Sequence, residues 1–347
     1  MNNLIKYPAG SKPILSAKET EVAIKSIKDF FELNLATELN LSRVTAPLFV
    51  PANTGINDDL SGIEQPVSFH SKALNGTKLE IVQSLAKWKR MMLGKLGVKP
   101  GYGLYTDMNA IRPDEECLDN THSLYVDQWD WERVITIENM SREYLEYMVQ
   151  KIYSILKRTE YYVCERFSGI NPELPENITF IHTEELLKLY PTLNPKEREN
   201  TFVKENKAVF IIGIGGELSD GTIHDLRAPD YDNWCHENGK GEKGLNGDIF
   251  VWNNVLGKAL ELSSMGIRVD KNALIKQLTI KGCLERKELM WHQMLLNDEM
   301  PLSIGGGIGQ SRLCMYFLRK VHIGEVQASV WPVEIIDECK KNNIALL

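Results

Sequence analysis

The sequence predicts an α+β fold in which helices flank an antiparallel β-sheet. Segments of strand length occur close enough in the chain to form hairpins, and longer segments with helical periodicity are inserted between them. The 347 residues contain neither an internal repeat nor a Pro/Ser-rich linker, so we expect a single domain over residues 1–347. Within it, residues 135–206 are expected to form a mostly helical insertion before the later strands.

The N-terminal part is expected to contain a helix followed by a strand. Residues 17–38 have apolar residues that we place near one helical face. These residues are Val22, Ile24, Ile27, Phe30, Phe31 and Leu33. Residues 43–50 then have the composition of a strand, in which Pro47 predicts an edge position or a break because proline cannot donate a ladder hydrogen bond.

Residues 102–132 have the pattern of a β-hairpin. One arm is YTDMNAIR (105–112), the turn is the polar segment PDEECLDNT (113–121), and the other arm is HSLYVDQWDWE (122–132). Further along, the predicted elements alternate between helix and strand. They are a long amphipathic helix at 141–168, short strands and helices to about 206, strands at 208–214, 247–254 and 258–264, a helix at 284–298, and a glycine run that opens a helix within 305–320.

Composition narrows the class of protein. No segment is long and apolar enough to cross a bilayer, and the N-terminus lacks the pattern of a signal peptide. Six cysteines stand far apart without a CxxC pair, which favours free thiols over a zinc site. A net charge of −7 disfavours a nucleic-acid partner. We therefore expect a cytoplasmic protein with no membrane and no nucleic-acid partner.

The second hairpin arm carries polar side chains where a core strand would be apolar. Strand alternation places Gln128, Asp130 and Glu132 on one face, and burying such groups without partners is costly. Arg112 lies on the partner arm, and its planar fork can bind two oxygens of a phosphate or carboxylate. The convergence of Arg112 with this polar face favours an anion-binding site. A strand face that is only exposed to solvent remains the alternative.

Two further patterns are weak when taken singly. GGGIGQSR (305–312) is neither a Walker A loop nor a dinucleotide fingerprint, and a tight turn is its simplest interpretation, although Arg312 just inside the helix favours a nucleotide site. Asp248 and Glu261 fall on consecutive predicted strands and could hold Mg²⁺, or they could be ordinary exposed acids. Convergence of these acids with Asp58, Asp130 and Asp232 would favour bound cations, because like charges repel.

These parts together resemble known families. Arg112-Pro-Asp-Glu with the strand ending at Glu132 resembles motif 2 of class II aminoacyl-tRNA synthetases, residues 307–312 resemble motif 3, and the helix 17–38 with the following strand resembles motif 1. A closer resemblance, from about residue 58 to the C-terminal region, is to the ammonia-dependent asparagine synthetases, the aspartate–ammonia ligases. The segments that carry it are QSLAKWKR, GLYTDMNAIRPDE, YVDQWDWERV, DLRAPDYDNW, LNGDI, ELSSMGIR and GGGIGQSRL.

The resemblance implies a function and a set of site residues. The implied reaction joins aspartate and ammonia at the expense of ATP, through an aspartyl-adenylate, with release of AMP and diphosphate, and a homodimer is implied by motif 1. The implied catalytic residues are Asp58, Arg112 and Gln128, with Asp58 as the base that deprotonates ammonium. The remaining implied residues bind aspartate (Lys89, Asp130, Asp232, Ser264), ATP (Arg112, Gly307, Arg312) and Mg²⁺ (Asp248, Glu261).

Two residues depart from the family pattern and receive no role. Gln83 stands where some members have His, and Asp59 stands where Asn is expected. Free ammonia is favoured as the nitrogen source, because Asn2 rather than the Cys of a glutaminase follows Met1. A tRNA-directed relative is the main alternative, which the acidic balance and the absence of spare length before motif 1 disfavour. An inactive paralogue is disfavoured because Arg112, Asp248, Glu261 and Arg312 are all present.

Overall fold

The computed structural model describes residues 5–8, 13–58, 60, 64–115, 117–238 and 241–347. The strands are β1 (Leu41–Arg43), β2 (Phe49–Pro51), β3 (Ser68–Ser71), β4 (Thr77–Ile81), β5 (Gly103–Ile111), β6 (Tyr125–Val134), β7 (Thr179–His182), β8 (Ala208–Ile212), β9 (Asn246–Asn253), β10 (Lys258–Ile267) and β11 (Ser303–Gly309). The α-helices are α1 (Ala17–Leu39), α2 (Ala86–Lys95), α3 (Arg142–Arg166), α4 (Thr183–Leu189), α5 (Pro195–Asn206), α6 (Lys271–Ile280), α7 (Met290–Leu296), α8 (Gln310–Phe317) and α9 (Val333–Lys341). Short 3₁₀ helices are η1 (Lys72–Leu74), η2 (Ile137–Asn139), η3 (Leu284–Glu288) and η4 (Ile323–Glu325).

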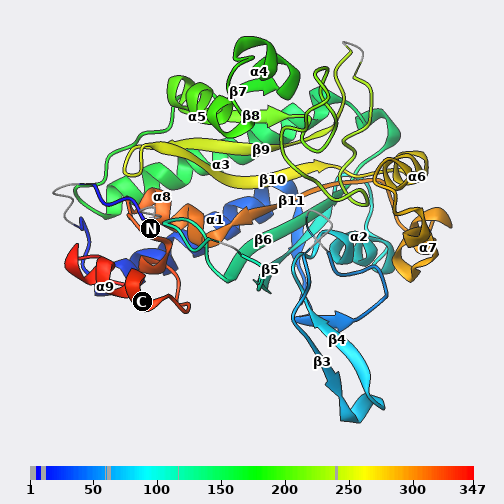
Figure 1. Ribbon diagram of the computed structural model, residues 1–347, viewed down its shortest axis with the longest axis horizontal. Helices are drawn as coiled ribbons and strands as arrows, with labels where there is room; N and C mark the ends of the chain where they lie inside the picture. The colour runs from blue at the N-terminus through cyan, green and yellow to red at the C-terminus, as the bar shows by residue number, and fades with distance from the viewer. Residues whose placement is uncertain (1–4, 9–12, 59, 61–63, 116, 239–240) are drawn as a thin grey trace.

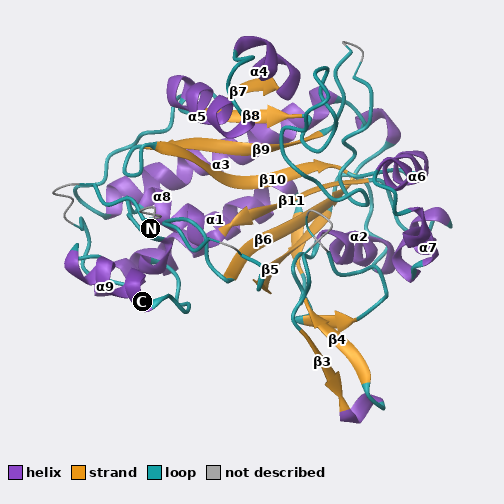
Figure 2. Ribbon diagram, viewed as in Figure 1, coloured by secondary structure: helices purple, strands orange, loops and turns teal. Residues whose placement is uncertain are grey.

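A large mixed sheet forms the centre of the molecule, as Figure 2 shows. Its described strands run in the order β1-β5-β6-β11-β10-β9-β8-β7. All neighbouring pairs are antiparallel except β1–β5 and β7–β8 at the two ends, which are parallel. The predicted α+β architecture is therefore confirmed, and the hairpin is β5–β6.

One face of this sheet is covered by helices α1, α3 and α8 (Figure 1). Trp129 and Trp131 of β6 point into that side and are fully buried, and the ring of Phe31 from α1 stacks on Trp129 with centroids 4.7 Å apart. Because side chains alternate along a strand, the residues between the two tryptophans point to the opposite face. The apolar layer on one side therefore fixes which polar side chains the strand presents on the other.

A smaller sheet, in the order β2-β4-β3, forms an arm that projects from the body (Figure 1). The rings of Phe49 and Phe69 pack edge to face across it, with centroids 5.3 Å apart. The sequence interpretation contains no strand at 68–81. Residues 135–206, the expected insertion, contain η2, α3, β7, α4 and α5, with β7 joining the edge of the large sheet. No helix in the described part of the chain has the length and apolarity that a membrane span requires.

Several predicted elements need correction. In α1 the buried positions include Ala23, Ile27 and Phe31, whereas Val22 and Leu33 are 55% and 68% exposed, so those two were wrongly placed on the buried face. The predicted strand 43–50 is broken, as Pro47 allowed, because its two ends join different sheets as β1 and β2.

The predicted helix 284–298 and the tight turn predicted for the glycine run at 305–312 also differ from the structure. The helix is two pieces, η3 and α7, separated by Leu289 in an extended conformation. A tertiary hydrogen bond from Trp291 N to Thr54 O (3.0 Å) accompanies the start of the second piece. The glycine run is not a loop but strand β11, paired with β6 on one side and β10 on the other.

Candidate active site

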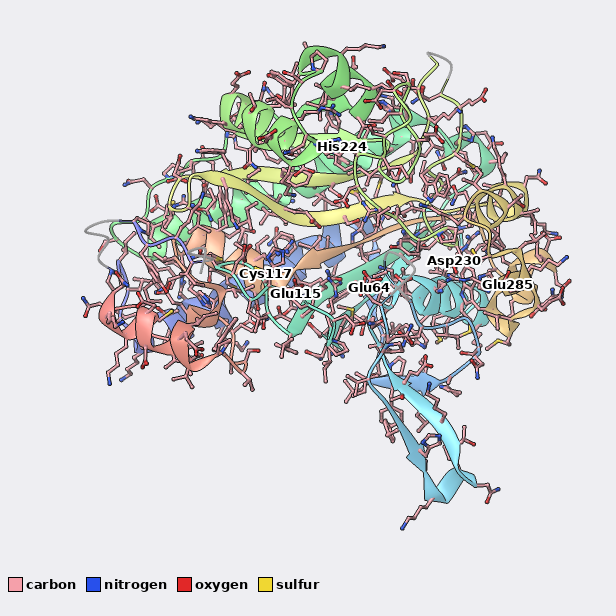
Figure 3. All side chains as sticks on the ribbon, in the orientation of Figure 1. Glu64, Glu115, Cys117, His224, Asp230 and Glu285 are labelled. Atoms are coloured by element: carbon pink, nitrogen blue, oxygen red, sulfur yellow. The ribbon has the colours of Figure 1, made fainter. Side chains whose placement is uncertain are left out.

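A cavity of about 1060 Å³ opens on the face of the sheet opposite the two tryptophans. This is the volume range of small-molecule and cofactor sites. Figure 3 shows three of its lining residues, Glu64, Glu115 and Cys117, in front of the strands. Of the residues that the sequence singled out for chemistry, those lining the cavity are Asp58, Lys89, Arg112, Gln128, Asp130, Asp232, Glu261, Ser264, Gly307 and Arg312. Asp248 lies buried nearby, and Asp59 is outside the described residues.

The glycines of β11 make room for the polar face of β6. Gly305 is paired with Glu132 and Gly307 with Asp130 in the antiparallel register. A Cβ on Gly305 would lie 1.8 Å from Glu132 Oε2, and a Cβ on Gly307 would lie 2.5 Å from Gln128 Oε1. The side chains of β6 therefore occupy the space above β11. The run consists of glycines because a larger residue there would collide with these side chains.

Lys89 of α2 is buried against this polar strand. Its ammonium group donates to Asp130 Oδ1 (2.5 Å) and to the carbonyl oxygen of Gly306 (2.7 Å). Burial lowers the pKa of Lys89, although the negative charge of Asp130 opposes that effect. Asp130 Oδ2 has no hydrogen-bond partner in the described part of the chain. That oxygen remains available to a ligand.

Arg268 joins two buried carboxylates. Its guanidinium donates to Glu132 Oε2 (2.8 Å) and also pairs with Asp232 Oδ1. Burial by itself would raise the pKa of Glu132, but Arg268 and then Lys89 hold that pKa below its usual range. Ser303 Oγ donates a further bond to Glu132 (2.7 Å). Buried charges persist only when paired and hydrogen-bonded, and this network meets that condition.

Asp232 presents a second oxygen to the cavity. Its Oδ2 accepts no hydrogen bond from any residue that the structure describes, and Arg227 Nε is 3.8 Å away. The carboxylates of Asp130 and Asp232 thus line one cavity, each anchored through one oxygen and each with the other oxygen unbonded. Two such carboxylates form a site for an ammonium group, and the neighbouring Lys89 adds a positive charge for a carboxylate.

Arg112 stands at the start of the hairpin turn, where its backbone N–H donates to Leu124 O (2.9 Å). Burial lowers the pKa of its guanidinium, and the positive charge of Arg312 lowers it further. Its Nε finds no hydrogen-bond partner among the described residues. Two neighbouring guanidinium groups favour an anion between them. This arrangement suits the binding of an anion.

Asp248 and Glu261 come from adjacent strands, β9 and β10, as the sequence predicted. Arg227 Nη2 donates to Asp248 Oδ1 (2.7 Å), and Arg312 Nη1 lies 3.5 Å from Glu261 Oε2. Burial raises the pKa of Asp248 to about 7, and the negative charge of Glu261 contributes to this rise. Ser264 lies opposite Asp248 in the β-ladder.

The pair does not by itself form a complete metal site. In the described ranges of the chain, no group of three or more His, Cys, Asp or Glu side chains could hold an ion. Mg²⁺ commonly uses one or two carboxylates together with substrate phosphates. Burial is the main cause of the raised pKa of Asp248, and the negative charge of Glu261 adds to it, so a bound cation would favour the ionised form of both carboxylates. The donor set therefore fits a magnesium ion that arrives with a nucleotide.

Asp58 lies on the loop after β2 and is 3% exposed. Its backbone N–H donates to Asn57 Oδ1 (3.0 Å), which orders this part of the loop. The negative charge of Asp58 raises the pKa of Tyr231 and opposes the lowering of the Arg112 pKa, and all three residues line the cavity.

The polar residues of the cavity to which the sequence assigned no role include Gln83, Arg227, Tyr231 and Arg268. Each lies in a segment that carried the family resemblance. The isolated arginines gave no local signal, because a single Arg in a sequence is most simply a surface ion pair. Only the partners that they meet, Asp248 for Arg227 and Glu132 for Arg268, distinguish them.

The fold of this chain is similar to that of a solved aminoacyl-tRNA synthetase structure. A crystal structure of asparaginyl-tRNA synthetase from Pyrococcus horikoshii, complexed with asparaginyl-adenylate, matches 90% of this chain and 70% of that chain, with a TM-score of 0.66 and 12% sequence identity. This likeness concerns the fold alone. It confirms the predicted class II aminoacyl-tRNA synthetase type of catalytic fold.

Sequence comparison gives the family. The family model described as aspartate–ammonia ligase matches residues 18–343. Aspartate–ammonia ligases from Bacteroides fragilis and Parabacteroides distasonis are 58% and 57% identical to this chain, over the full length of the chain and of each relative. The chain belongs to the aspartate–ammonia ligase family, whose name describes an enzyme that forms a carbon–nitrogen bond.

Proposed function

We propose that this protein synthesises L-asparagine from L-aspartate and ammonia through an aspartyl-adenylate, with ATP as co-substrate and AMP and diphosphate as products. The observation that carries the proposal is one cavity with two kinds of polar wall. Lys89, Asp130 and Asp232 match the charges of an amino acid, and Arg112 with Arg312 matches the charge of phosphates. Full-length identity of 58% to an aspartate–ammonia ligase supports the same reaction.

Aspartate binding is assigned to the ion-paired side of the cavity. Lys89 would bind the α-carboxylate, and the unbonded oxygens of Asp130 and Asp232 would accept hydrogen bonds from the α-ammonium group. Gln128 would hold the side-chain carboxyl together with Arg112, and Ser264 would complete the contacts. A zwitterion fits because each of its charges meets an opposite one in a buried setting.

The first chemical step is adenylate formation. A side-chain carboxylate oxygen of aspartate attacks the α-phosphorus of ATP, the bond to the β-phosphate bridging oxygen breaks, and diphosphate leaves with the electron pair. Arg112 and Arg312 would stabilise the negative charge that develops, and such preorganised groups are each worth about 10²–10³ in rate. Gly307 at the end of β11 would let the backbone approach the nucleotide. Asp248 and Glu261 would hold Mg²⁺, which when bound neutralises phosphate charge.

The second step is amidation. Ammonium must lose a proton before its nitrogen can attack the acyl carbonyl, and the buried carboxylate of Asp58 would accept that proton. Nitrogen then forms the C–N bond, the C–O bond to AMP breaks, and AMP leaves with the electron pair. The remaining excess proton on nitrogen passes to solvent.

We also propose that the chain acts as a cytoplasmic homodimer. The exposed apolar residues Val22 and Leu33 on α1, the helix that resembles motif 1, support a partner on that surface. Free cysteines throughout the described residues support a reducing compartment. Sedimentation equilibrium of the purified protein tests the dimer, and a monomer at micromolar concentration would contradict it.

The function is tested by supplying aspartate, ATP, Mg²⁺ and ¹⁵N-labelled ammonium to the purified protein. The expected products are ¹⁵N-asparagine and AMP in equal amounts. ADP in place of AMP would indicate an acyl-phosphate route and overturn the adenylate step. Transfer of labelled aspartate to tRNA, without free asparagine, would favour the tRNA-directed alternative.

A further inference from the structure

The side-chain carboxamide of Gln83 is buried. The residue is 0% exposed and lines the cavity, yet neither its Nε2 nor its Oε1 has a hydrogen-bond partner among the residues that the structure describes. Burying an amide without hydrogen bonds is costly, and native proteins rarely leave one so. A polar group held in this way at a binding cavity points to a ligand that supplies its hydrogen bonds.

The backbone places Gln83 directly beside Asp58. Asn57 Oδ1 accepts one hydrogen bond from Asp58 N (3.0 Å) and another from Gln83 N (2.9 Å). Asn57 Nδ2 in turn donates to Ile81 O (3.1 Å) at the end of β4. One side-chain amide thus clamps the Asp58 loop to the segment that enters α2. Asp58 and Gln83, which both line the cavity, are therefore held close together through their backbones.

The chemistry of this corner suits a small nitrogen donor. Ammonium carries several N–H bonds, so its binding requires hydrogen-bond acceptors in addition to the base that deprotonates it. The carbonyl oxygen of Gln83 supplies an acceptor without adding a second negative charge beside Asp58, where like charges would repel. A carboxamide does not take up a proton at neutral pH, so Gln83 can hold the nitrogen while Asp58 removes the proton.

We propose that Gln83 is the second residue of the subsite that binds the nitrogen donor, an inference that rests on the proposed function. Gln83 Oε1 accepts an N–H bond from ammonium, and the same bond holds ammonia after its proton has passed to Asp58. This orients the nitrogen lone pair toward the acyl carbonyl. The balance of bonds and protons is that of the amidation step described above.

The central test is Gln83→Met, which keeps approximate volume and removes both hydrogen-bonding groups. Three quantities are measured: the KM for ammonium, the KM for aspartate and the rate of ATP–diphosphate exchange. The KM for ammonium is expected to rise about ten- to a hundredfold, because a hydrogen bond to a charged ligand is lost. The KM for aspartate and the exchange rate stay within about twofold of the wild type, and more AMP is released per asparagine as unused adenylate hydrolyses.

The same measurements can overturn the inference. An unchanged KM for ammonium would remove Gln83 from the subsite, and a parallel loss of exchange would make it an aspartate or nucleotide residue. Gln293→Met is the matched control, since it removes a half-buried carboxamide of α7 that lies outside the cavity lining. It should leave all three quantities unchanged. Wild-type synthesis of asparagine with AMP tests the proposed function separately, so failure of the Gln83 test leaves the proposed function standing and the two failures are distinguishable.

A second variant covers the case in which Gln83→Met does not fold. Gln83→His keeps an acceptor in the neutral ring but loses it on protonation, near pH 6.5 for an unperturbed imidazole. Its KM for ammonium is expected to lie within about fivefold of the wild type at pH 8. Below about pH 6.5 that KM should rise more steeply than in the wild type, while exchange follows the wild-type profile. Superimposable pH profiles for the KM of ammonium would contradict the proposal.

Discussion

Two walls of the cavity are built on different principles. The ion-paired wall consists of the lining residues Lys89, Asp130, Asp232 and Arg268, together with Glu132. All five are nearly fully buried, and they form a Lys89–Asp130 pair and a group in which Arg268 pairs with both Glu132 and Asp232. The loop wall consists of Asp58, Gln83 and Arg112. There, the carboxamide of Gln83 and the Nε of Arg112 lack hydrogen-bond partners among the described residues.

The difference teaches which parts of the site are complete before substrate arrives. In the ion-paired wall, each charge offsets another, so the protein itself keeps the geometry and leaves single oxygens of Asp130 and Asp232 for the ligand. In the loop wall, polar groups bear an unfavourable burial that substrate binding would relieve. Variants of the first wall should therefore cost stability, and variants of the second should cost particular reaction steps.

The largest expected effect is on the loop wall. Asp58→Asn should lower the rate of asparagine synthesis about 10²–10⁴-fold, because the base that deprotonates ammonium is lost. ATP–diphosphate exchange with aspartate should continue, since adenylate formation does not use that base. If exchange and synthesis fall together, Asp58 serves the first step as well and the separation of the two walls fails.

The ion-paired wall is broken most directly by Arg268→Met. Removing this guanidinium leaves Glu132 and Asp232 buried without their partner, and the free energy of unfolding should fall by about 3–5 kcal/mol. Urea unfolding followed by circular dichroism measures the change. Arg43→Met is the control, because Arg43 forms a surface pair with Asp107 (2.9 Å) that is worth at most about 1 kcal/mol. Equal losses in both variants would show that the wall gains nothing from burial.

Gly305→Ala tests the packing of the same wall. The new Cβ would lie 1.8 Å from Glu132 Oε2 and 2.6 Å from Arg268 Nη2, so the ion pair must shift. The expected loss is about 1–3 kcal/mol of unfolding free energy, as for other overpacked sites. Gly309→Ala is the matched control, since the nearest atoms to its Cβ would be side-chain carbons of Arg312 at ordinary distances of 3.4–3.7 Å. A melting temperature that Gly305→Ala leaves unchanged would mean that β6 and β11 adjust freely.

The last effect, which depends on pH, concerns the buried Asp248. Burial raises its pKa from an ordinary 3.8 to about 7 in the folded state, so between those values the folded protein holds the proton more tightly than the unfolded chain. This contribution to stability is present below about pH 4 and lost as the pH rises through 7. Relative to Asp248→Asn, the wild type should lose up to about 1.4 kcal/mol per pH unit over that window. Parallel urea-derived stabilities from pH 4 to 8, without Mg²⁺, would mean that Arg227 compensates Asp248 fully.

Much of this site could be predicted because strand alternation and chain order are local properties. The face of β6 that carries Gln128 and Asp130 follows from the period of a strand, once Trp129 is placed in the core. The same reasoning fails for α1, where Val22 and Leu33 are exposed, because a helix with apolar residues on several sides does not state which side is buried. Local reasoning also fails for residues 284–298, because Trp291 forms a hydrogen bond with Thr54, a residue that is distant in the sequence.

The order of the motifs, the hairpin and ten of the residues that line the cavity could be predicted from the sequence, since each rests on a local pattern or on strings that are typical of one family. The role of the glycine run, the pairing of Arg268 with Glu132 and Asp232, and a Gln83 carboxamide without a hydrogen-bond partner among the described residues required the folded structure. The reason is physical: burial and pairing depend on segments that are distant in sequence, as in the separation of 136 positions from Glu132 to Arg268. A charge in the sequence has no assigned partner until folding excludes water around it.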